Sequence, residues 1–336
     1  MSRTAVIRGI GAWVPPRIVT NDELARELDT SDEWIRSRTG ISQRHIADPD
    51  MATSDLAVEA GGRALKSAST ASVDFVIVAT STPDRPCPAT APSVASRLGL
   101  GTAAAFDVGA VCTGFLYSLA AGAGLIAAGT AESVLVLGAD TFSTILDPVD
   151  RSTRAVFGDG AGGVVLAAGA PDEPGALGRF DLASDGEGSD LITVPSGGSR
   201  DPVRTGPGRA AEAADPYFRM EGRTVFRNAV ERMAASALRV AGARGWDVGA
   251  VDLLVAHQAN LRIMNAVADR MRLPRERCAV NVDRVGNTAA ASIPLALVDA
   301  MDDGTLRPGH RVVLTAFGGG LTWGSCALRW PDLVAG

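Results

Sequence analysis

Two pairs of short apolar segments recur in this chain at the same spacing. Residues 73–79 (VDFVIVA) resemble residues 251–256 (VDLLVA), and residues 132–137 (ESVLVL) resemble residues 310–315 (HRVVLT). Both pairs are offset by 178 residues, the difference between 251 and 73 and between 310 and 132. Short runs of β-branched and apolar residues are typical of buried strands. The equal offsets predict two copies of one α/β unit, although short apolar strands also resemble each other by chance.

The length of 336 residues allows two domains. We place their boundary near residue 170, which gives an N-terminal half, residues 1–170, and a C-terminal half, residues 171–336. Hydrophobic residues make up 46% of the chain and aromatic residues only 5%, so the core is expected to pack through Ala, Val, Leu and Gly. Residues 53–68 are expected to form an amphipathic helix.

Residues 181–220, between the repeated units, are rich in Gly, Pro and charged residues. Within them, the runs 197–202 and 205–208 favour turns over regular structure. A long loop inside a compact domain is usually either functional or disordered. The segment is therefore interpreted equally as a cover over a site entrance and as a variable surface insert.

Cys112 stands where a short apolar strand gives way to a helix. A thiol at a helix start lies at the positive end of the helix dipole, which predicts a lowered thiol pKa and a thiolate nucleophile. The alternative is a buried structural cysteine, because free Cys is often buried. The 24 positions from Val108 to Ala131 carry no charge and could span a bilayer. Their five glycines favour a helix in the core of a large protein instead.

Two polar residues far downstream are candidate partners of Cys112. His257 directly follows the apolar run 251–256, and Asn287 follows Gly286 in a turn. The carboxyl ends of strands are where open α/β sheets build their sites. A Cys with a distant His and Asn is typical of an enzyme with a cysteine nucleophile.

Further motifs extend this pattern over almost the whole chain. They are WIRSRTGI at 34–41, FDVGAVCTGF at 106–115, DR at 150–151 with FGDGAG at 157–162, HQAN at 257–260, GNT at 286–288 and FGGGLTWG at 317–324. In this order they resemble the β-ketoacyl-acyl carrier protein synthase III family, which are condensing enzymes of the thiolase-fold superfamily. Each motif is weak alone, but together they are highly specific.

The resemblance implies both a fold and a reaction. The fold would be α/β and thiolase-like, with duplicated βαβαβαββ halves in a five-layered αβαβα arrangement. The reaction would be a decarboxylating Claisen condensation of an acyl-CoA primer with malonyl-acyl carrier protein. Its products are a β-ketoacyl-acyl carrier protein, CoA and CO₂, and it starts fatty-acid or polyketide chains.

The resemblance also implies roles for the candidate residues. Cys112 would carry the acyl group, and His257 and Asn287 would donate hydrogen bonds to the malonyl thioester carbonyl. The N–H groups of Cys112 and Gly319 would form an oxyanion hole for acyl transfer. A plain turn between two strands is the alternative interpretation of the glycines around Gly319.

Five cationic or aromatic residues match the family's substrate-delivery positions. Trp34 and Arg151 match the pair that sandwiches the adenine of CoA, and Arg38 matches a residue near the CoA phosphates. Arg262 and Arg227 match cations presented to the acidic acyl carrier protein. Trp34 is alternatively a core residue, and surface arginines often have no specific role.

Cys87 is a departure from the family pattern, which often has Phe at this position. That aromatic residue helps to close the acyl pocket, in some members across the dimer interface. The smaller Cys87 predicts that the acyl pocket accepts groups longer or bulkier than acetyl.

Several classes of function are excluded. The net charge of −6 argues against a nucleic-acid partner. The cysteines form no CxxC pair and the histidines are scattered, so no metal site is expected. The GxGxxG pattern at 158–163 precedes an apolar strand, whereas NAD binding requires a helix there. We expect no permanently bound cofactor, no membrane partner and no signal peptide. A homodimer in the cytoplasm is expected, where a thiol stays reduced.

Two alternatives of different class remain. An acyltransferase of the same fold would move the acyl group to a hydroxyl or amine in secondary metabolism, with less need of Asn287. A catalytically silent partner subunit would lack the nucleophile, so the presence of Cys112 argues against this alternative. Primer length, primer branching and the pathway served stay open.

Overall fold

The computed structural model describes residues 3–202 and 214–336. The first of its two large sheets lies in the N-terminal half. Its strand order is β1-β7-β6-β4-β5, in which β4 runs parallel to β5 and β6, and β7 runs antiparallel to β6 and β1. The bounds are β1 Thr4–Trp13, β4 Phe75–Ala79, β5 Ala104–Val108, β6 Ser133–Asp140 and β7 Gly160–Gly169.

The second sheet lies in the C-terminal half and repeats this topology in shorter form. Its strand order is β11-β12-β13-β8, with β11 parallel to β12 and β13 antiparallel to both neighbours. The bounds are β8 Asp181–Ser184, β11 Leu253–Ala256, β12 Arg311–Gly318 and β13 Thr322–Arg329. Small two-stranded sheets pair β2, Ile18–Thr20, with β3, Gln43–His45, and β9, Ile192–Thr193, with β10, Arg219–Met220.

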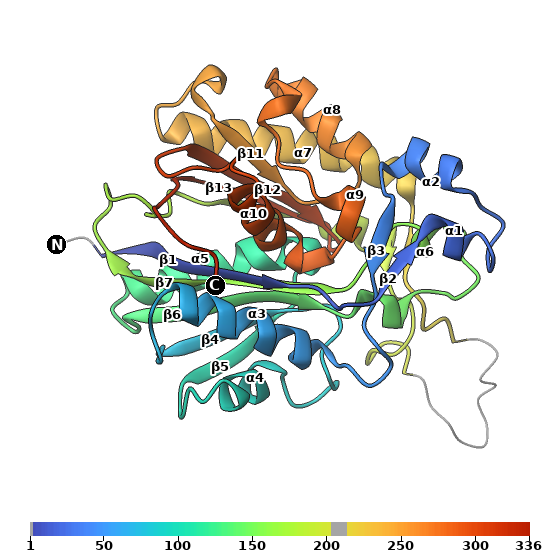
Figure 1. Ribbon diagram of the computed structural model, residues 1–336, viewed down its shortest axis with the longest axis horizontal. Helices are drawn as coiled ribbons and strands as arrows, with labels where there is room; N and C mark the ends of the chain where they lie inside the picture. Colours follow the sequence, from blue (N-terminus) through green and yellow to red (C-terminus); the bar gives the residue numbers. More distant parts are fainter. Residues whose placement is uncertain (1–2, 203–213) are drawn as a thin grey trace.

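Helices separate and cover the two sheets, as Figure 1 shows. Helices α3 and α4 pack on the outer face of the first sheet, and α7 packs with α8 outside the second. Helices α5 and α10 lie between the sheets. The resulting helix–sheet–helix–sheet–helix layers confirm the five-layered α/β fold that was expected. The bounds are α3 Thr53–Ser67, α4 Ala91–Arg97, α5 Gly114–Ala127, α7 Gly222–Ala243, α8 Leu261–Met271 and α10 Ser292–Asp302.

The 178-residue repeat is present in the pairing of the strands. Phe75 of β4 pairs in register with Val134 of β6, and Leu253 of β11 pairs with Val312 of β12. In both parallel pairs the partners are therefore 59 residues apart in the sequence. The same 178-residue offset relates α5 to α10 at their first residues. It also relates two short 3₁₀ turns, Val111–Thr113 and Ala289–Ala291. Chance similarity of strands does not produce matching registers, turns and helices.

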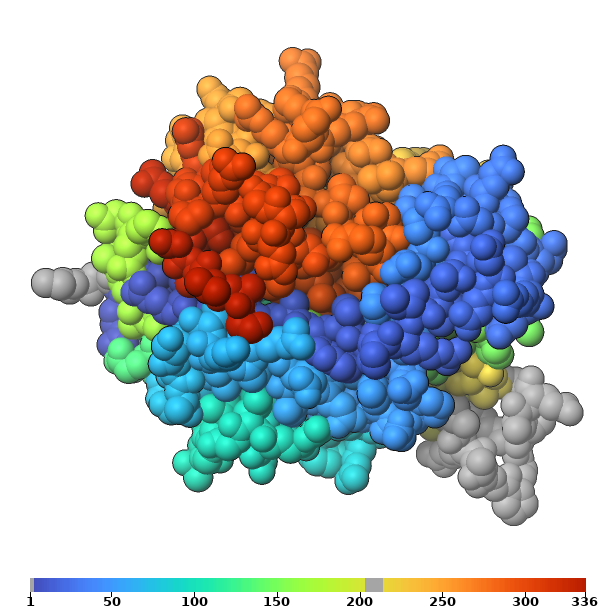
Figure 2. Space-filling view, in the orientation of Figure 1, coloured from blue at the N-terminus to red at the C-terminus, as the bar shows by residue number. Residues whose placement is uncertain are grey.

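The N-terminal segment places α2, Asp32–Thr39, beside the C-terminal half. Residues near the blue end of the chain lie against orange residues in Figure 2. The Ser42 N–H donates to the carbonyl oxygen of Asp283 at 2.8 Å, and Gly40 lies against Leu261 at the start of α8. The Ser31 hydroxyl caps α2 by accepting from the Trp34 N–H at 3.1 Å. Short elements completing this region are α1 Asn21–Leu24, α6 Arg151–Arg154 and α9 Val282–Val285.

The remaining expectations about local structure have mixed outcomes. Within the uncharged run, residues 114–127 form the helix α5, and none of the described helices has both the length and the apolarity to cross a membrane. The GxGxxG glycines run into strand β7 and open no helix. Residues 181–220 are not one loop, since β8 forms the edge of the second sheet. The run 205–208 lies outside the described residues, and residues 197–201 of the other run form bends.

Candidate active site

Cys112 lies between the end of strand β5 and the first turn of helix α5. The strand ends at Val108, the 3₁₀ turn Val111–Thr113 carries the cysteine, and α5 begins at Gly114. Val111 enters the turn with a φ of 46°, a region in which a β-branched residue is strained. Such strain persists only where the surroundings hold it, and it is common at functional sites.

A cavity of about 110 Å³ brings three predicted residues together. Cys112, His257 and Asn287 all line it, and they are 9%, 2% and 5% exposed. A deep pocket with apolar walls and a few convergent polar groups is the usual form of a binding site. The apolar walls are formed mainly by Phe157, Phe218, Val225, Phe226, Met233 and Phe317.

His257 directly follows strand β11, and its ring is held on one side. Its backbone N–H donates to the carbonyl oxygen of Thr315 at 2.8 Å. Its Nδ1 lies 2.7 Å from the hydroxyl oxygen of Ser292, the first residue of α10. Burial lowers the pKa of His257 to about 3. The imidazole is therefore neutral near pH 7, and Ser292 orients it.

Asn287 is fixed by its backbone and by its side-chain oxygen. Its N–H donates to the Val156 carbonyl at 2.9 Å, and its carbonyl accepts from the Gly158 N–H at 3.0 Å. Its Oδ1 accepts from the Ala289 N–H at 3.0 Å. Because the side-chain oxygen is occupied inside the protein, the amide nitrogen is the atom left to donate into the cavity.

The ionisation of Cys112 differs from the sequence prediction. Burial raises the pKa of its thiol well above the ordinary value, the charge of Asp140 adds to the rise, and a hydrogen bond from its own N–H opposes it. A helix terminus contributes about 0.3–1 kcal/mol, which is less than one pKa unit. Full burial shifts a pKa by as much as about 3–5 units. The prediction of a lowered pKa was wrong because burial outweighs the helix dipole.

Within the glycine run 318–320, Gly318 lines the cavity and Gly319 does not. A Cβ atom placed on Gly318 would lie 2.9 Å from the backbone nitrogen of Cys112. Gly319 packs beside Val111 and Ile192, and a Cβ atom there would lie 3.2 Å from Val111 Cγ2. Both glycines therefore adjoin the Cys112 turn, with Gly318 facing the cysteine N–H.

Trp34 of α2 lies among the cations that the sequence associated with it. The guanidinium carbons of Arg38 and Arg151 lie 4.5 Å and 5.0 Å from its ring centroid. Arg151 also donates to the backbone carbonyl and the carboxylate of Asp29. The three predicted CoA-binding residues thus form one cluster on the surface.

A wide, shallow cavity of about 870 Å³ adjoins the inner one. Both cavities include Gly222, Phe226 and Asn260 in their walls. Four arginines line the outer cavity, namely Arg38, Arg223, Arg227 and Arg262. A cleft lined by one sign of charge attracts anionic ligands, and this one leads to the cavity of Cys112.

Comparisons with known proteins agree with this geometry. The family profile "3-Oxoacyl-[acyl-carrier-protein (ACP)] synthase III" matches residues 106–186, and the profile of its C-terminal part matches residues 242–330. A β-ketoacyl-acyl carrier protein synthase III of Streptomyces coelicolor is 62% identical over 333 residues, which cover 98% of each chain. The chain belongs to the β-ketoacyl-acyl carrier protein synthase III family.

Other members of the synthase III family are similar over the whole chain. A Pseudomonas aeruginosa synthase III is 54% identical, with 99% of each chain covered. The crystal structure of a P. aeruginosa synthase III matches with a TM-score of 0.92 at 53% identity, covering 99% of this chain and 100% of that chain. The priming β-ketosynthase of the R1128 polyketide pathway matches with a TM-score of 0.91 at 33% identity, covering 98% of this chain and 97% of that chain. The expected thiolase fold and acyltransferase class are confirmed.

Cys87 lies away from the cavity in this synthase III chain. It is exposed, in the segment between β4 and α4, and it does not line the cavity of Cys112. Within one chain it therefore does not close the acyl pocket. A role for Cys87 requires a second subunit, which stays a prediction.

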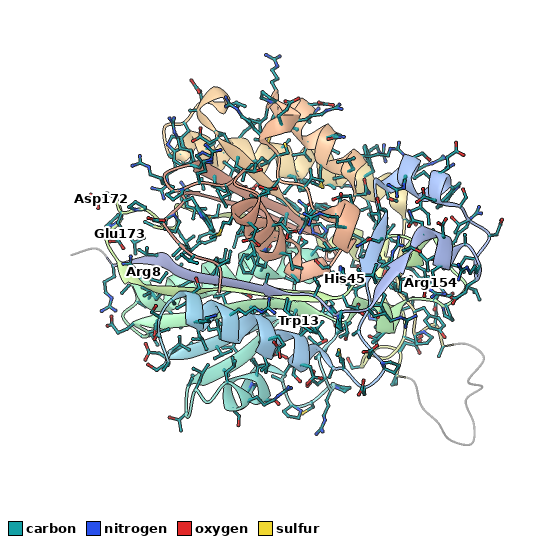
Figure 3. All side chains as sticks on the ribbon, in the orientation of Figure 1. Arg8, Trp13, His45, Arg154, Asp172 and Glu173 are labelled. Atoms are coloured by element: carbon teal, nitrogen blue, oxygen red, sulfur yellow. The ribbon has the colours of Figure 1, made fainter. Side chains whose placement is uncertain are left out.

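Metal-binding side chains do not cluster within residues 3–202 and 214–336. His45, which is labelled in Figure 3, is held elsewhere. Its Nδ1 lies 2.6 Å from the carbonyl oxygen of Pro15. Cys278 and Cys326 are free thiols, and burial raises the pKa of both.

Three residues of this site escaped the sequence analysis. Ser292 contacts the His257 ring, Asp140 lies near Cys112, and Arg223 joins the arginines of the outer cavity. Ser292 stands five residues after Asn287, but the sequence analysis predicted no helix there. Nothing in the sequence near Asp140 points to Cys112.

Proposed function

We propose that this synthase III condenses an acyl-CoA primer with malonyl-acyl carrier protein at Cys112, with His257 and Asn287 assisting. The observation that carries the proposal is the single cavity lined by all three side chains. The reaction yields a β-ketoacyl-acyl carrier protein, CoA and CO₂, with no permanently bound cofactor. It starts fatty-acid or polyketide chains.

The first half-reaction is acyl transfer to Cys112. The sulfur attacks the thioester carbonyl of the acyl-CoA, the bond to the CoA sulfur breaks, and the thiol proton leaves with CoA as its thiol. The negative charge on the carbonyl oxygen is stabilised by the N–H groups of Cys112 and Gly319. Removing such a donor typically costs about 10²–10³ in rate. The raised pKa of Cys112 keeps the resting enzyme in the thiol form.

The second half-reaction forms the carbon–carbon bond. The malonyl thioester loses CO₂, and the electron pair of the broken bond makes an enolate. The enolate carbon attacks the acyl carbonyl, and the Cys112 thiolate leaves and regains a proton from solvent. One proton is consumed overall. Neutral His257, with Ser292 donating to Nδ1 and the proton on Nε2, donates with Asn287 to the enolate oxygen.

Substrate delivery uses the cations outside the cavity. Trp34 and Arg151 hold the adenine of CoA through stacking and cation–π attraction, and Arg38 binds its phosphates. Arg227 and Arg262 attract the acidic acyl carrier protein, whose phosphopantetheine arm then reaches Cys112. The proposal is supported by the outer cavity, which Arg38, Arg227 and Arg262 line.

The enzyme acts in the cytoplasm as a homodimer. Each subunit consists of an N-terminal and a C-terminal half, with the boundary near residue 170. A dimer is supported by β5, an edge strand whose Phe106 and Val108 are only half-buried. Such an edge invites pairing with another chain. The dimer would carry Cys87 of each subunit to the acyl pocket of the other.

Intact mass spectrometry tests the proposal. Incubation with acyl-CoA should add the acyl mass to the peptide that contains Cys112, and Cys112→Ser should lose most of it. Addition of malonyl-acyl carrier protein should then release a β-ketoacyl product and CO₂. Labelling at Cys87, Cys278 or Cys326 would contradict the assignment, and acyl transfer to a hydroxyl or amine without CO₂ release would favour the acyltransferase alternative.

A further inference from the structure

The two repeated halves keep equivalent hydrogen bonds at the end of the sheets far from Cys112. Asp74 accepts from the Ser133 N–H at 2.9 Å, and Asp252 accepts from the Arg311 N–H at 2.8 Å. Donor and acceptor in the second bond are each 178 residues after those in the first. The internal symmetry therefore extends to individual side-chain contacts.

At the other end, the symmetry relates Cys112 to Ala290. Both residues are second in a 3₁₀ turn, and the turns begin at Val111 and Ala289 with φ values of 46° and 47°. The same offset relates Asp140, the last residue of β6, to Gly318, the last residue of β12. Each turn thus faces the end of a strand from the opposite half.

The symmetry is broken at this pair of strand ends. Oδ2 of Asp140 accepts from the Ala290 N–H at 3.1 Å. Gly318 has no side chain, although a Cβ atom there would lie 2.9 Å from the nitrogen of Cys112. The φ of Gly318 is not positive, so the backbone does not demand glycine there. Beside the Ala290 N–H, a carboxylate oxygen of Asp140 therefore occupies this place. Beside the Cys112 N–H, the equivalent place is open, because residue 318 is a glycine.

Asp140 also links the Ala290 turn to the rest of the site. The carboxylate is fully buried, and its Oδ1 accepts from the Ser81 N–H at 2.6 Å and the Thr80 hydroxyl at 3.2 Å. The residue before Ala290, Ala289, donates to Oδ1 of Asn287. Holding Ala290 therefore holds the turn whose first N–H orients the Asn287 amide.

We propose that Asp140 is a positioning residue for the malonyl half-reaction. Its carboxylate fills the place beside the Ala290 N–H that is equivalent, in the other half, to the oxyanion position beside the Cys112 N–H. It thereby fixes the turn that orients Asn287. This inference rests on the proposed function. Acyl transfer to Cys112 depends on the open place between Gly318 and the Cys112 N–H. Loss of the Asp140 carboxylate therefore slows the malonyl half-reaction more than acyl transfer.

The test compares the half-reactions in Asp140→Asn. Asn keeps the shape but has one acceptor oxygen, which cannot serve both the Ala290 N–H and the Ser81 N–H. We expect CO₂ release from malonyl-acyl carrier protein to fall about tenfold or more. Acylation of Cys112 by acyl-CoA should stay within about threefold of native, because the Asp140 side chain bonds to the Ala290 turn and not to the Cys112 turn.

Asp74→Asn is the control, because it changes an exposed carboxylate that accepts from the Ser133 N–H in the same half, away from the cavity. It should change neither half-reaction by more than about twofold. Equal slowing of both half-reactions in Asp140→Asn, or unchanged CO₂ release, would overturn the proposal. A native enzyme that performs neither half-reaction would instead reject the proposed function.

Gly318→Ala decides the matter if Asp140→Asn does not fold. The added Cβ atom would lie 2.9 Å from the Cys112 backbone nitrogen, so that turn must shift, and Cys112 acylation should fall about a hundredfold. Acylation within about threefold of native would show that the two places are not equivalent, and the Asp140 proposal would fall with it.

Discussion

The guanidinium carbon of Arg151 lies 5.0 Å from the centroid of the Trp34 ring. The two side chains proposed to hold an adenine therefore already face each other. Arg151 is also bound to Asp29 at the surface. An adenine entering between ring and guanidinium would replace this cation–π contact by stacking on both of its faces.

Trp34→Ala should raise the KM for acyl-CoA with little change in kcat. A cation–π or stacking contact is worth about 0.5–2 kcal/mol, which corresponds to about 2–30-fold. Steady-state kinetics with acyl-CoA and with acyl-pantetheine, which lacks the adenine, measure the effect. Equal losses with both substrates would show that Trp34 acts as a core residue.

His257 should remain neutral across the physiological range, because burial lowers its pKa to about 3. Its folded-state pKa lies below the ordinary value, so the neutral form dominates at every pH above about 3. NMR of labelled histidine should show one imidazole signal that is constant from about pH 5 to about pH 9 and is absent in His257→Asn. A signal that is lost in this variant but titrates near pH 6.5 would contradict the prediction.

Ser292→Ala should slow malonyl decarboxylation by about 2–13-fold, since a neutral hydrogen bond is worth about 0.5–1.5 kcal/mol. The reason is that the His257 ring loses its contact at Nδ1. Ser325→Ala is the matched control, because its buried hydroxyl lies 2.8 Å from Thr315 Oγ1. Equal effects of the two substitutions on decarboxylation would show a general packing effect.

The acyl pocket should accept groups longer or bulkier than acetyl, because Cys87 stands where a larger aromatic residue is common. Cys87→Phe should cost about 1–3 kcal/mol, or one to two decades in kcat/KM, with the smallest loss for acetyl. The measurement is kcat/KM for acetyl-, butyryl-, isobutyryl- and hexanoyl-CoA. A native enzyme restricted to acetyl-CoA, or equal slowing with every substrate, would show that Cys87 does not set the pocket.

The sequence predicted the parts of the site that follow strand ends. Periodicity and the 178-residue offset located β4, β6, β11 and β12, and the motifs located Cys112, His257 and Asn287. These residues are recognisable because each belongs to a local pattern. The cavity that they share is a finding of the structure.

The remaining parts depend on contacts between distant segments. Asp140 meets Ala290 across 150 residues, and Ser292 meets His257 across 35. The thiol pKa of Cys112 was predicted in the wrong direction, because a helix start is visible in sequence whereas the depth of burial is not. Cys87 also lies outside the cavity of its own chain, and its contact with the acyl pocket of a second chain stays a prediction.

The central claim is that Cys112 carries the acyl group while Asn287 and His257 serve the malonyl step. The most direct test is intact mass spectrometry of Asn287→Ala after addition of acyl-CoA and then malonyl-acyl carrier protein. We predict that this variant acylates Cys112 at a near-native rate and then retains the acyl group, because the enolate lacks a donor worth about 10²–10³ in rate. Discharge of the acyl group as fast as in the native enzyme, with β-ketoacyl product formed, would contradict it.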